Sequence, residues 1–280
     1  MKSLQDSVRT SLDSTNPDIF PYLPYILQDS WGIGASFEDI KTLIEKHFEI
    51  TQGLKVLDLG CGKGAVSIQL AQALGCSCVG IDGMPEFIDE ARTKASQRNV
   101  NQLCAFLHAD IRLVVEGFTG YDIVILGAIG PVLGNYYQTL SRLKHCLSEK
   151  GIIIIDDGYL PDNKLQSDNS VQDKELSENN PQNENTEDNE INYTAYGKEE
   201  ILKQASDAGF VLKDEIVMKS DTITNSNQKI FDALKRRCED LIHQHPSQKN
   251  MFEQYIKTQE GENSNLENNL ICSTMLFIRA

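Results

Sequence analysis

Basic residues are scarce in this chain of 280 residues. It has 26 lysines and arginines against 41 aspartates and glutamates, which gives a formal net charge of −15 at pH 7. Tracking a nucleic acid backbone requires a basic face, because positive side chains make most of the phosphate contacts. No run of the sequence is dense in lysine or arginine. We therefore expect no nucleic-acid partner.

Long apolar runs are also missing. No stretch approaches the roughly 20 apolar residues that span a bilayer, and the N-terminus has neither the apolar core nor the cleavage site of a signal peptide. We expect no membrane partner and a cytoplasmic location. The cysteines number seven, an odd count, and several have apolar neighbours, as is typical of reduced thiols in a protein core. Cys76-x-Cys78 has no second pair or nearby histidine, so we predict no metal there.

What the chain does contain is one ordered pattern between Lys55 and Asp82. Its apolar spacing and its glycines predict four consecutive elements: a buried strand over 56–59, a tight turn over 60–64, a helix over 65–74 and a strand over 76–82. This is a strand–turn–helix–strand unit with an acid at the end of its second strand.

The chemistry of this unit predicts a ligand that carries a ribose. Glycines let the chain bend sharply and let a ligand approach the backbone, and the start of the helix presents free N–H groups to the turn. Asp82, some 20 residues past the turn, is placed to accept both ribose hydroxyls. Asp58 lies inside the end of the first strand, where it would repel a pyrophosphate and suit a cation such as an amino acid ammonium.

The string LDLGCGKG over 57–64 resembles motif I of the class I S-adenosylmethionine (SAM) methyltransferases. The resemblance implies a doubly wound, seven-stranded α/β sheet, mostly parallel with a C-terminal antiparallel hairpin, and SAM as the cofactor. It also implies that the string HAD over 108–110 forms the adenine-contact turn. The cofactor contacts expected from it are Asp58, Gly60, Cys61, Gly62, Gly64, Asp82, Gly83, Met84, Ala109, Asp110, Ile111 and Gly127.

Acceptor contacts are sought in the aromatic residues outside this unit. In the family that the chain resembles, the segment before the first strand often folds over SAM and substrate. This makes Tyr22, Tyr25 and Trp31 candidate substrate contacts, with ordinary packing of an N-terminal helix on the sheet as the alternative; Tyr193 is a further candidate.

No catalytic base is evident. Weak candidates are Asp156, Tyr159 and Tyr196, at or after the end of the apolar strand over 152–155. Paired carboxylates such as Asp156 and Asp157 can bind a metal or act as a base. In metal-dependent relatives a further acid ends the preceding strand, where this chain has Gly127, so we expect no metal. Instead, one carboxylate should contact substrate and the other should cap the turn.

The sequence divides into a helical cap over 1–50 and a SAM-binding domain over 51–280. The domain carries two insertions: an acidic one over 162–192, whose composition predicts disorder, and a helical one over 222–262. We expect two helices there, about 227–243 and 247–259, that form a lid, a dimer contact or plain core.

The function predicted is methyl transfer from SAM to a small-molecule acceptor by a monomer or homodimer. Two alternatives stay open: an NAD(P)-dependent oxidoreductase on a similar nucleotide fold, and a SAM-binding sensor or scaffold without catalysis.

Overall fold

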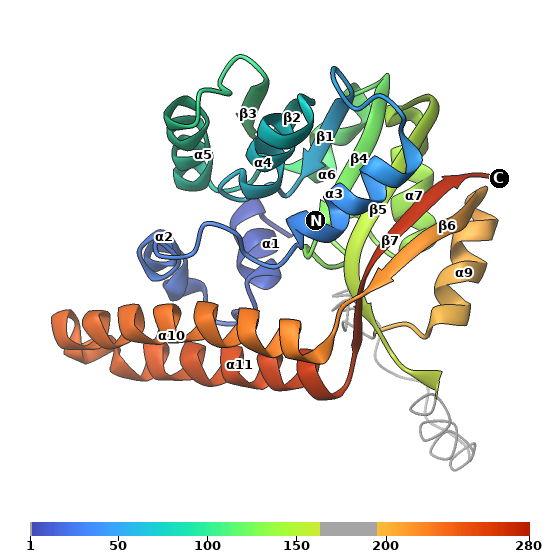
Figure 1. The fold of residues 1–280 in the computed structure, drawn as a ribbon. Coiled ribbons are helices and arrows are strands. Elements are labelled where there is room, and N and C mark those ends of the chain that lie inside the picture. The colour runs from blue at the N-terminus through green and yellow to red at the C-terminus, as the bar shows by residue number, and fades with distance from the viewer. Residues whose placement is uncertain (1, 163–194) are drawn as a thin grey trace, which may run out of the picture.

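The computed structural model describes residues 2–162 and 195–280 and places seven strands in one sheet (Figure 1). The strand order is β3-β2-β1-β4-β5-β7-β6, and β7 runs antiparallel to both of its neighbours while the other pairs are parallel. The strands are β1 (Lys55–Leu59), β2 (Ser77–Asp82), β3 (Cys104–His108), β4 (Tyr121–Gly127), β5 (Leu147–Tyr159), β6 (Phe210–Val217) and β7 (Ile271–Arg279). The predicted fold class is confirmed.

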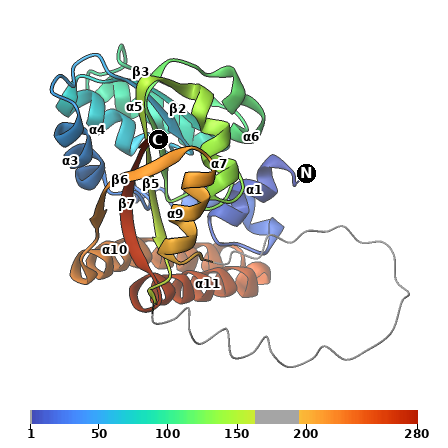
Figure 2. The ribbon, with the colours of Figure 1, turned by 90° about the vertical axis from the view of Figure 1, so that its right-hand side faces the viewer.

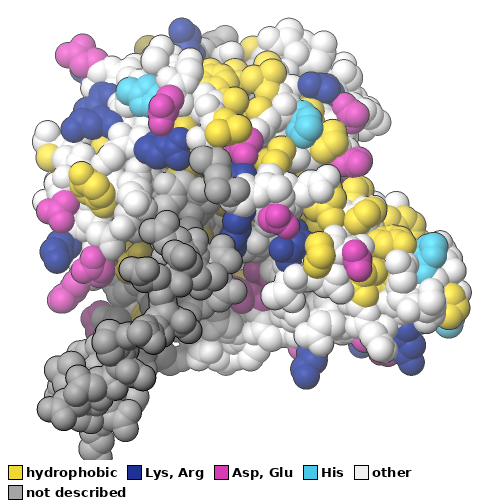
Figure 3. Space-filling model, turned by 180° about the vertical axis from the view of Figure 1, so that it is seen from behind, with side chains coloured by type: hydrophobic (Ala, Val, Ile, Leu, Met, Phe, Trp, Pro, Cys, Tyr) yellow, Lys and Arg dark blue, Asp and Glu magenta, His cyan; other side chains and the backbone are white. Residues whose placement is uncertain are grey.

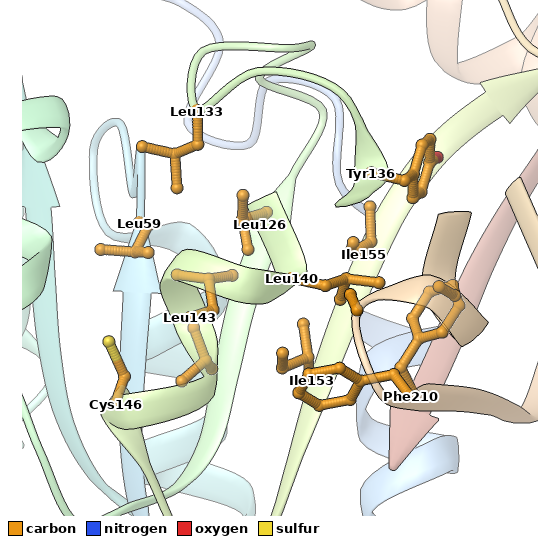
Figure 4. Close-up of a cluster of buried hydrophobic side chains, with 14 of the residues drawn as sticks. Leu59, Leu126, Leu133, Tyr136, Leu140, Leu143, Cys146, Ile153, Ile155 and Phe210 are labelled. Atoms are coloured by element: carbon orange, nitrogen blue, oxygen red, sulfur yellow. The ribbon is translucent and has the colours of Figure 1, made fainter. Parts of the chain in front are cut away.

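Helices cover both faces of the sheet, which is why its central strands are apolar throughout. The four isoleucines over 152–155 in β5 are each at most 6% exposed. Ile152 and Ile154 pack on one face, and Ile153 and Ile155 on the other. Figure 4 shows the second face, where Leu140 and the labelled side chains around it surround Ile153 and Ile155.

Each helical layer follows from an apolar stripe at helical spacing. One face carries α3 (Phe37–His47), α4 (Ala65–Leu74) and α5 (Pro85–Gln97), and the other carries α6 (Ile111–Val114), η2 (Val115–Gly117), α7 (Tyr136–Leu143), η3 (Lys144–Cys146) and α9 (Lys198–Asp207). The predicted helix over 65–74 is confirmed as α4. Ser36 accepts a hydrogen bond from the backbone N–H of Asp39, and Gly75 ends α4 in the left-handed conformation.

A third apolar cluster joins the two ends of the chain. The elements are α1 (Leu4–Ser11), η1 (Pro17–Tyr22), α2 (Leu23–Ile26), α10 (Ser220–Gln244), η4 (Pro246–Gln248) and α11 (Lys249–Asn268). In Figures 1 and 2 the α10–α11 pair runs below the sheet, with α1 between it and the strands. Ile19 and Leu23 pack with Leu234 and Phe252 there, and Met84, directly after β2, joins the same cluster. We call residues 4–27 and 220–268 the cap; it lies at the carboxyl ends of the parallel strands.

Several boundaries differ from the sequence predictions. Helix α7 begins at Tyr136, because Asn135 forms a capping box with Gln138. Strand β5 extends to Tyr159 because β7 continues to pair with it, and α10 and α11 extend the predicted insertion of 222–262 to 220–268, through polar turns without apolar periodicity.

The predicted 1–50 cap is divided in the structure, since α3 packs on the sheet with α4. The predicted disorder over 162–192 lies outside the described residues, apart from Asp162. Within the described part of the chain, no helix has the length and apolar character needed to cross a bilayer.

Candidate cofactor and acceptor site

The glycine turn leaves β1 and is fastened to the neighbouring strand. The backbone N–H groups of Gly60 and Cys61 donate to the carbonyl oxygen of Ile81, at 2.8 and 3.0 Å. Gly60 has φ +74°, and a Cβ at this position would collide with the side chain of Ile129 from the loop after β4. Glycine is therefore required both by the backbone conformation and by this close approach. Gly64, in the left-handed region, leads directly into α4.

Asp82 closes the turn from the end of β2. Its Oδ2 accepts the backbone N–H of Gly62 at 2.8 Å, and its Oδ1 accepts that of Met84 at 2.8 Å. Burial raises the pKa of this carboxyl, and the backbone donors oppose the rise. The predicted ribose acid is thus hydrogen-bonded directly to the glycine turn.

Asp58 lies on the inner side of the same turn. It is 3% exposed, and its Oδ2 accepts the hydroxyl of Ser67 in α4 at 2.6 Å. Burial raises its pKa to about 6, and the negative charge of Asp82 adds to the rise. A carboxylate whose pKa is raised by burial and by a neighbouring carboxylate would be stabilised in its charged form by a nearby cation. The site therefore favours a ligand with a positive group.

The predicted adenine side lies around the end of β3. The N–H of Ala109 donates to the carbonyl oxygen of Asp82 at 3.0 Å. The carboxylate of Asp110 caps α6 and forms an ion pair with Arg112 at 2.6 Å, which lowers its pKa. The carboxylate predicted to accept the adenine amino group is therefore already shared with a guanidinium, a partner that the sequence analysis missed. Ile111 is buried in the core beneath this turn.

The end of β4 is covered by the N-terminal segment. A Cβ on Gly127 would lie 2.6 Å from the Cβ of Ala35, and one on Gly34 would lie 2.5 Å from that of Ala128. Ala128 itself has φ +54°, an uncommon conformation for a residue with a side chain. Gly127 was predicted to contact the cofactor. In the structure, the small residues at this strand end let the 34–35 segment approach it.

Asp156 is an anchor for this segment. It is 6% exposed, and its Oδ2 accepts both the backbone N–H of Ser36 and the hydroxyl of Thr274, each at 3.0 Å. Burial raises its pKa to about 6. The neighbouring Asp157 accepts from the N–H of Gly158, but it lies inside β5, opposite Ser273 of β7, and not at the turn that it was predicted to cap.

The two tyrosine candidates for catalysis lie among other partners. The hydroxyl of Tyr159 donates to Glu215 at 3.0 Å, and Lys198, which forms an ion pair with Glu215, lies 5.5 Å from the centre of the Tyr159 ring. Tyr196 packs edge-on against Tyr136, with ring centres 6.2 Å apart. Asp156, Tyr159 and Tyr196 therefore bond to different groups and do not form one catalytic cluster among the described residues.

Two of the aromatic substrate candidates bind the helices of the cap. Tyr22 donates to the side chain of Gln248 at 2.7 Å and packs edge-on against Phe252. Tyr25 donates to Asp240 at 3.3 Å, and the guanidinium of Arg237 lies 5.3 Å from its ring centre. Both side chains thus pack within the cap and not on the sheet, where the alternative had placed the N-terminal helix. Tyr193 lies outside the described residues.

Trp31 lies against the outside of the glycine turn. Its Nε1 donates to the backbone oxygen of Lys63 at 3.0 Å, and the guanidinium of Arg98 lies 4.4 Å from its ring. Lys63 was missed by the sequence analysis as a structural residue, although a lysine between two glycines is its visible signal. Its side chain is fully buried and binds the carbonyl oxygen of Leu27.

No ring of metal ligands is found in residues 2–162 and 195–280. SAM, by contrast, fits the donor set of this site: the buried carboxylate of Asp58 and the partly buried carboxylate of Asp82 meet at a glycine turn whose backbone a ligand can approach. Asp58 and the turn would hold the cationic methionine part, and Asp82 the ribose.

Comparisons with known proteins were made for the whole chain. A family profile described as "Methyltransferase domain" matches residues 50–210. A probable cobalt-precorrin-6B C(15)-methyltransferase (decarboxylating) from Thermoplasma acidophilum is 25% identical over 126 residues, which are 42% of this chain and 59% of that protein. A ribosomal protein L11 methyltransferase from Thermosipho melanesiensis is 33% identical over 125 residues, 44% of this chain and 45% of that protein. The chain thus matches about half the length of these relatives.

The fold has close structural neighbours. A SAM-dependent methyltransferase from Geobacter sulfurreducens, solved in complex with S-adenosyl-L-homocysteine, superposes with a TM-score of 0.69 at 16% identity. The alignment covers 93% of this chain and 98% of that one. At this identity the likeness concerns the fold, and it includes the cap as well as the sheet.

Proposed function

This chain belongs to the methyltransferase-domain family and takes S-adenosylmethionine as its cofactor, and on that premise we propose that it methylates a small-molecule acceptor. The observation that carries the proposal is the pairing of Asp82 with Gly62 at 2.8 Å, with the buried Asp58 on the other side of the same turn. This arrangement would suit a ribose and a cationic amino acid group in one ligand.

The reaction requires little from the protein beyond alignment. SAM supplies an electrophilic methyl group on a sulfonium, and transfer is an in-line displacement by the acceptor atom. Holding donor and acceptor in line and away from water can supply most of the rate enhancement. Asp58 and Asp82 would fix the donor, while the loop after β4 and the 34–35 segment would exclude water near the methyl group.

The position of the cap favours a small-molecule acceptor. Its helices lie across the carboxyl ends of the strands, where open α/β sheets bind their ligands (Figure 1). Basic side chains do not gather into a broad patch on the described surface seen in Figure 3, where they alternate with acidic ones. Among the relatives named above, one acts on a precorrin and another on a ribosomal protein, so acceptor size is the property to test.

A SAM-binding sensor or scaffold remains a second candidate. The observation that favours it is that the polar atoms of Asp156 and Tyr159 are bonded to protein partners rather than arranged as a base. Such a protein would bind SAM and transfer its methyl group to no acceptor. The oxidoreductase alternative has lost its support, because the family match is to methyltransferases.

The first experiment is a calorimetric titration of the purified protein with SAM, S-adenosylhomocysteine (SAH) and, as a control, NADH. We expect SAM and SAH to bind with micromolar affinity and NADH not to bind. Labelled-methyl transfer is then measured with pooled small molecules, with ribosomal RNA and with ribosomal protein. Label in the small-molecule pool alone supports the proposal; label only in a macromolecule, or in no acceptor despite SAM binding, would overturn it.

A further inference from the structure

Lys63 is a fully buried lysine in the middle of the cofactor turn. Its side chain is 0% exposed, and its ammonium meets three groups outside the turn. The Nζ donates to the carbonyl oxygen of Leu27 at 2.6 Å, forms an ion pair with Glu90 at 3.1 Å and lies 5.5 Å from the ring centre of Phe87. A lysine between two glycines suggests an anion-binding role, but this side chain is directed to the cap.

The backbone of the same residue makes a second attachment. The carbonyl oxygen of Lys63 accepts the indole N–H of Trp31 at 3.0 Å. Leu27 ends α2, and Trp31 lies four residues farther along the chain. The segment 27–31 is therefore fastened at both ends to one residue of the turn. Farther along the chain, the 34–35 segment lies against the end of β4.

The charge on Lys63 has a cost that packing alone does not explain. Burial lowers the pKa of its ammonium, and Glu90 opposes that effect. Burying an ammonium costs several kcal/mol, and apolar residues of similar volume often replace buried ion pairs without loss of stability. A methionine could fill the same space, so the ammonium is explained better by the specific contact with Leu27 than by stability.

The residue that holds the segment, Lys63, also lies next to a group predicted to bind the cofactor. Gly62, directly before Lys63, donates its N–H to Asp82. A ligand held by Asp82 and the glycine backbone therefore fixes Lys63, and Lys63 in turn fixes 27–31. We propose that Lys63 is a positioning residue that couples cofactor binding at the turn to the ordering of residues 27–31. The coupling rests on the proposed function, since it takes SAM and SAH as the ligands.

The test compares three variants by SAH titration and by hydrogen exchange of residues 27–31 with and without SAH. Lys63→Met removes the side-chain attachment, and Trp31→Phe removes the indole N–H while keeping an aromatic ring. Lys94→Met is the control: Lys94 also pairs with Glu90, at 3.2 Å, and its ammonium lies 5.5 Å from the ring centre of Trp31, but it does not contact Leu27, so both hydrogen-bonded attachments of the segment remain. Melting temperatures are measured in parallel to separate stability from coupling.

We expect SAH to slow the exchange of 27–31 in the wild type and in Lys94→Met, and much less in Lys63→Met. By reciprocity the affinity for SAH should fall about tenfold in Lys63→Met and by a smaller factor in Trp31→Phe. The proposal would be overturned if Lys63→Met bound SAH with wild-type affinity and SAH still protected residues 27–31. It would be overturned equally if the variant only melted at a lower temperature, with affinity and protection unchanged.

The proposal and the proposed function fail in different ways. If the wild type binds neither SAM nor SAH, the proposed function fails and the coupling fails with it. The attachment itself is still judged without ligand: faster exchange of 27–31 in Lys63→Met than in Lys94→Met would show that Lys63 holds the segment. Equal exchange in the two variants would overturn the attachment as well.

Discussion

Asp82 in β2 and Asp156 in β5 accept hydrogen bonds from different donors, and the donors separate their roles. Asp82 accepts two backbone N–H groups around the glycine turn, whereas Asp156 accepts one from Ser36 and a hydroxyl from Thr274. Both acids follow an apolar strand in the sequence. The first therefore faces a ligand turn, and the second ties the N-terminal segment to β7.

Removing the Asp82 carboxylate should weaken cofactor binding. We expect Asp82→Ala to reduce the affinity for SAH by more than about 1.5 kcal/mol, the scale of lost charged hydrogen bonds. Calorimetric titration with SAH measures this loss of affinity. Asp122→Ala is the control: Asp122 accepts two bonds, from Lys55 and Ser148, at the amino end of β4, so its loss should lower stability and leave affinity unchanged. A folded Asp82→Ala protein with wild-type affinity would refute the ribose role.

At the scale of elements, the sequence predicted what depends on local periodicity. The turn at 60–64 and the helix that ends at Gly75 lie as predicted, because apolar spacing and glycine positions act within a few residues. The sequence did not predict that Tyr22 and Tyr25 bind α10 and α11, because those contacts join residues more than 200 positions apart. Nor did the sequence show that α3 packs on the sheet and not in the cap, since its apolar face could pack on either of them.

The contact of α1 with the end of β2 gives a prediction about one such distant pair. A Cβ on Gly83 would lie 2.5 Å from a methyl of Val8 and 2.8 Å from one of Leu4. Gly83→Ala should therefore push α1 off the sheet and speed hydrogen exchange of residues 4–11. Val8→Ala should restore part of the slow exchange in the double variant, because it removes the closer of the two colliding methyls. No change in Gly83→Ala would mean that α1 does not rest on this turn in solution.

At the scale of the whole molecule, acidity and burial act in the same direction. The chain carries a net charge of −15, and two buried acids have a pKa raised to about 6: Asp58 and Asp156. Desolvation is the first cause for each of them. Asp214, whose pKa is lowered to about 2 by Lys46 and His47, is the opposite case, on the surface of β6. Self-repulsion and buried charge therefore both disfavour the folded state at neutral pH.

The melting temperature should consequently rise as the pH falls from 8 to 5. Because the folded state takes up protons near pH 6 and the unfolded state near pH 4, folding binds protons in this window and acid stabilises the fold. Each unit of pKa difference is worth about 1.4 kcal/mol per group. Asp214 opposes this only below about pH 4.

Asp156→Asn, which keeps an oxygen for Ser36 and Thr274, should flatten the slope of melting temperature against pH and raise stability at pH 8. A melting temperature that falls steadily from pH 8 to 5 would contradict the burial of these acids.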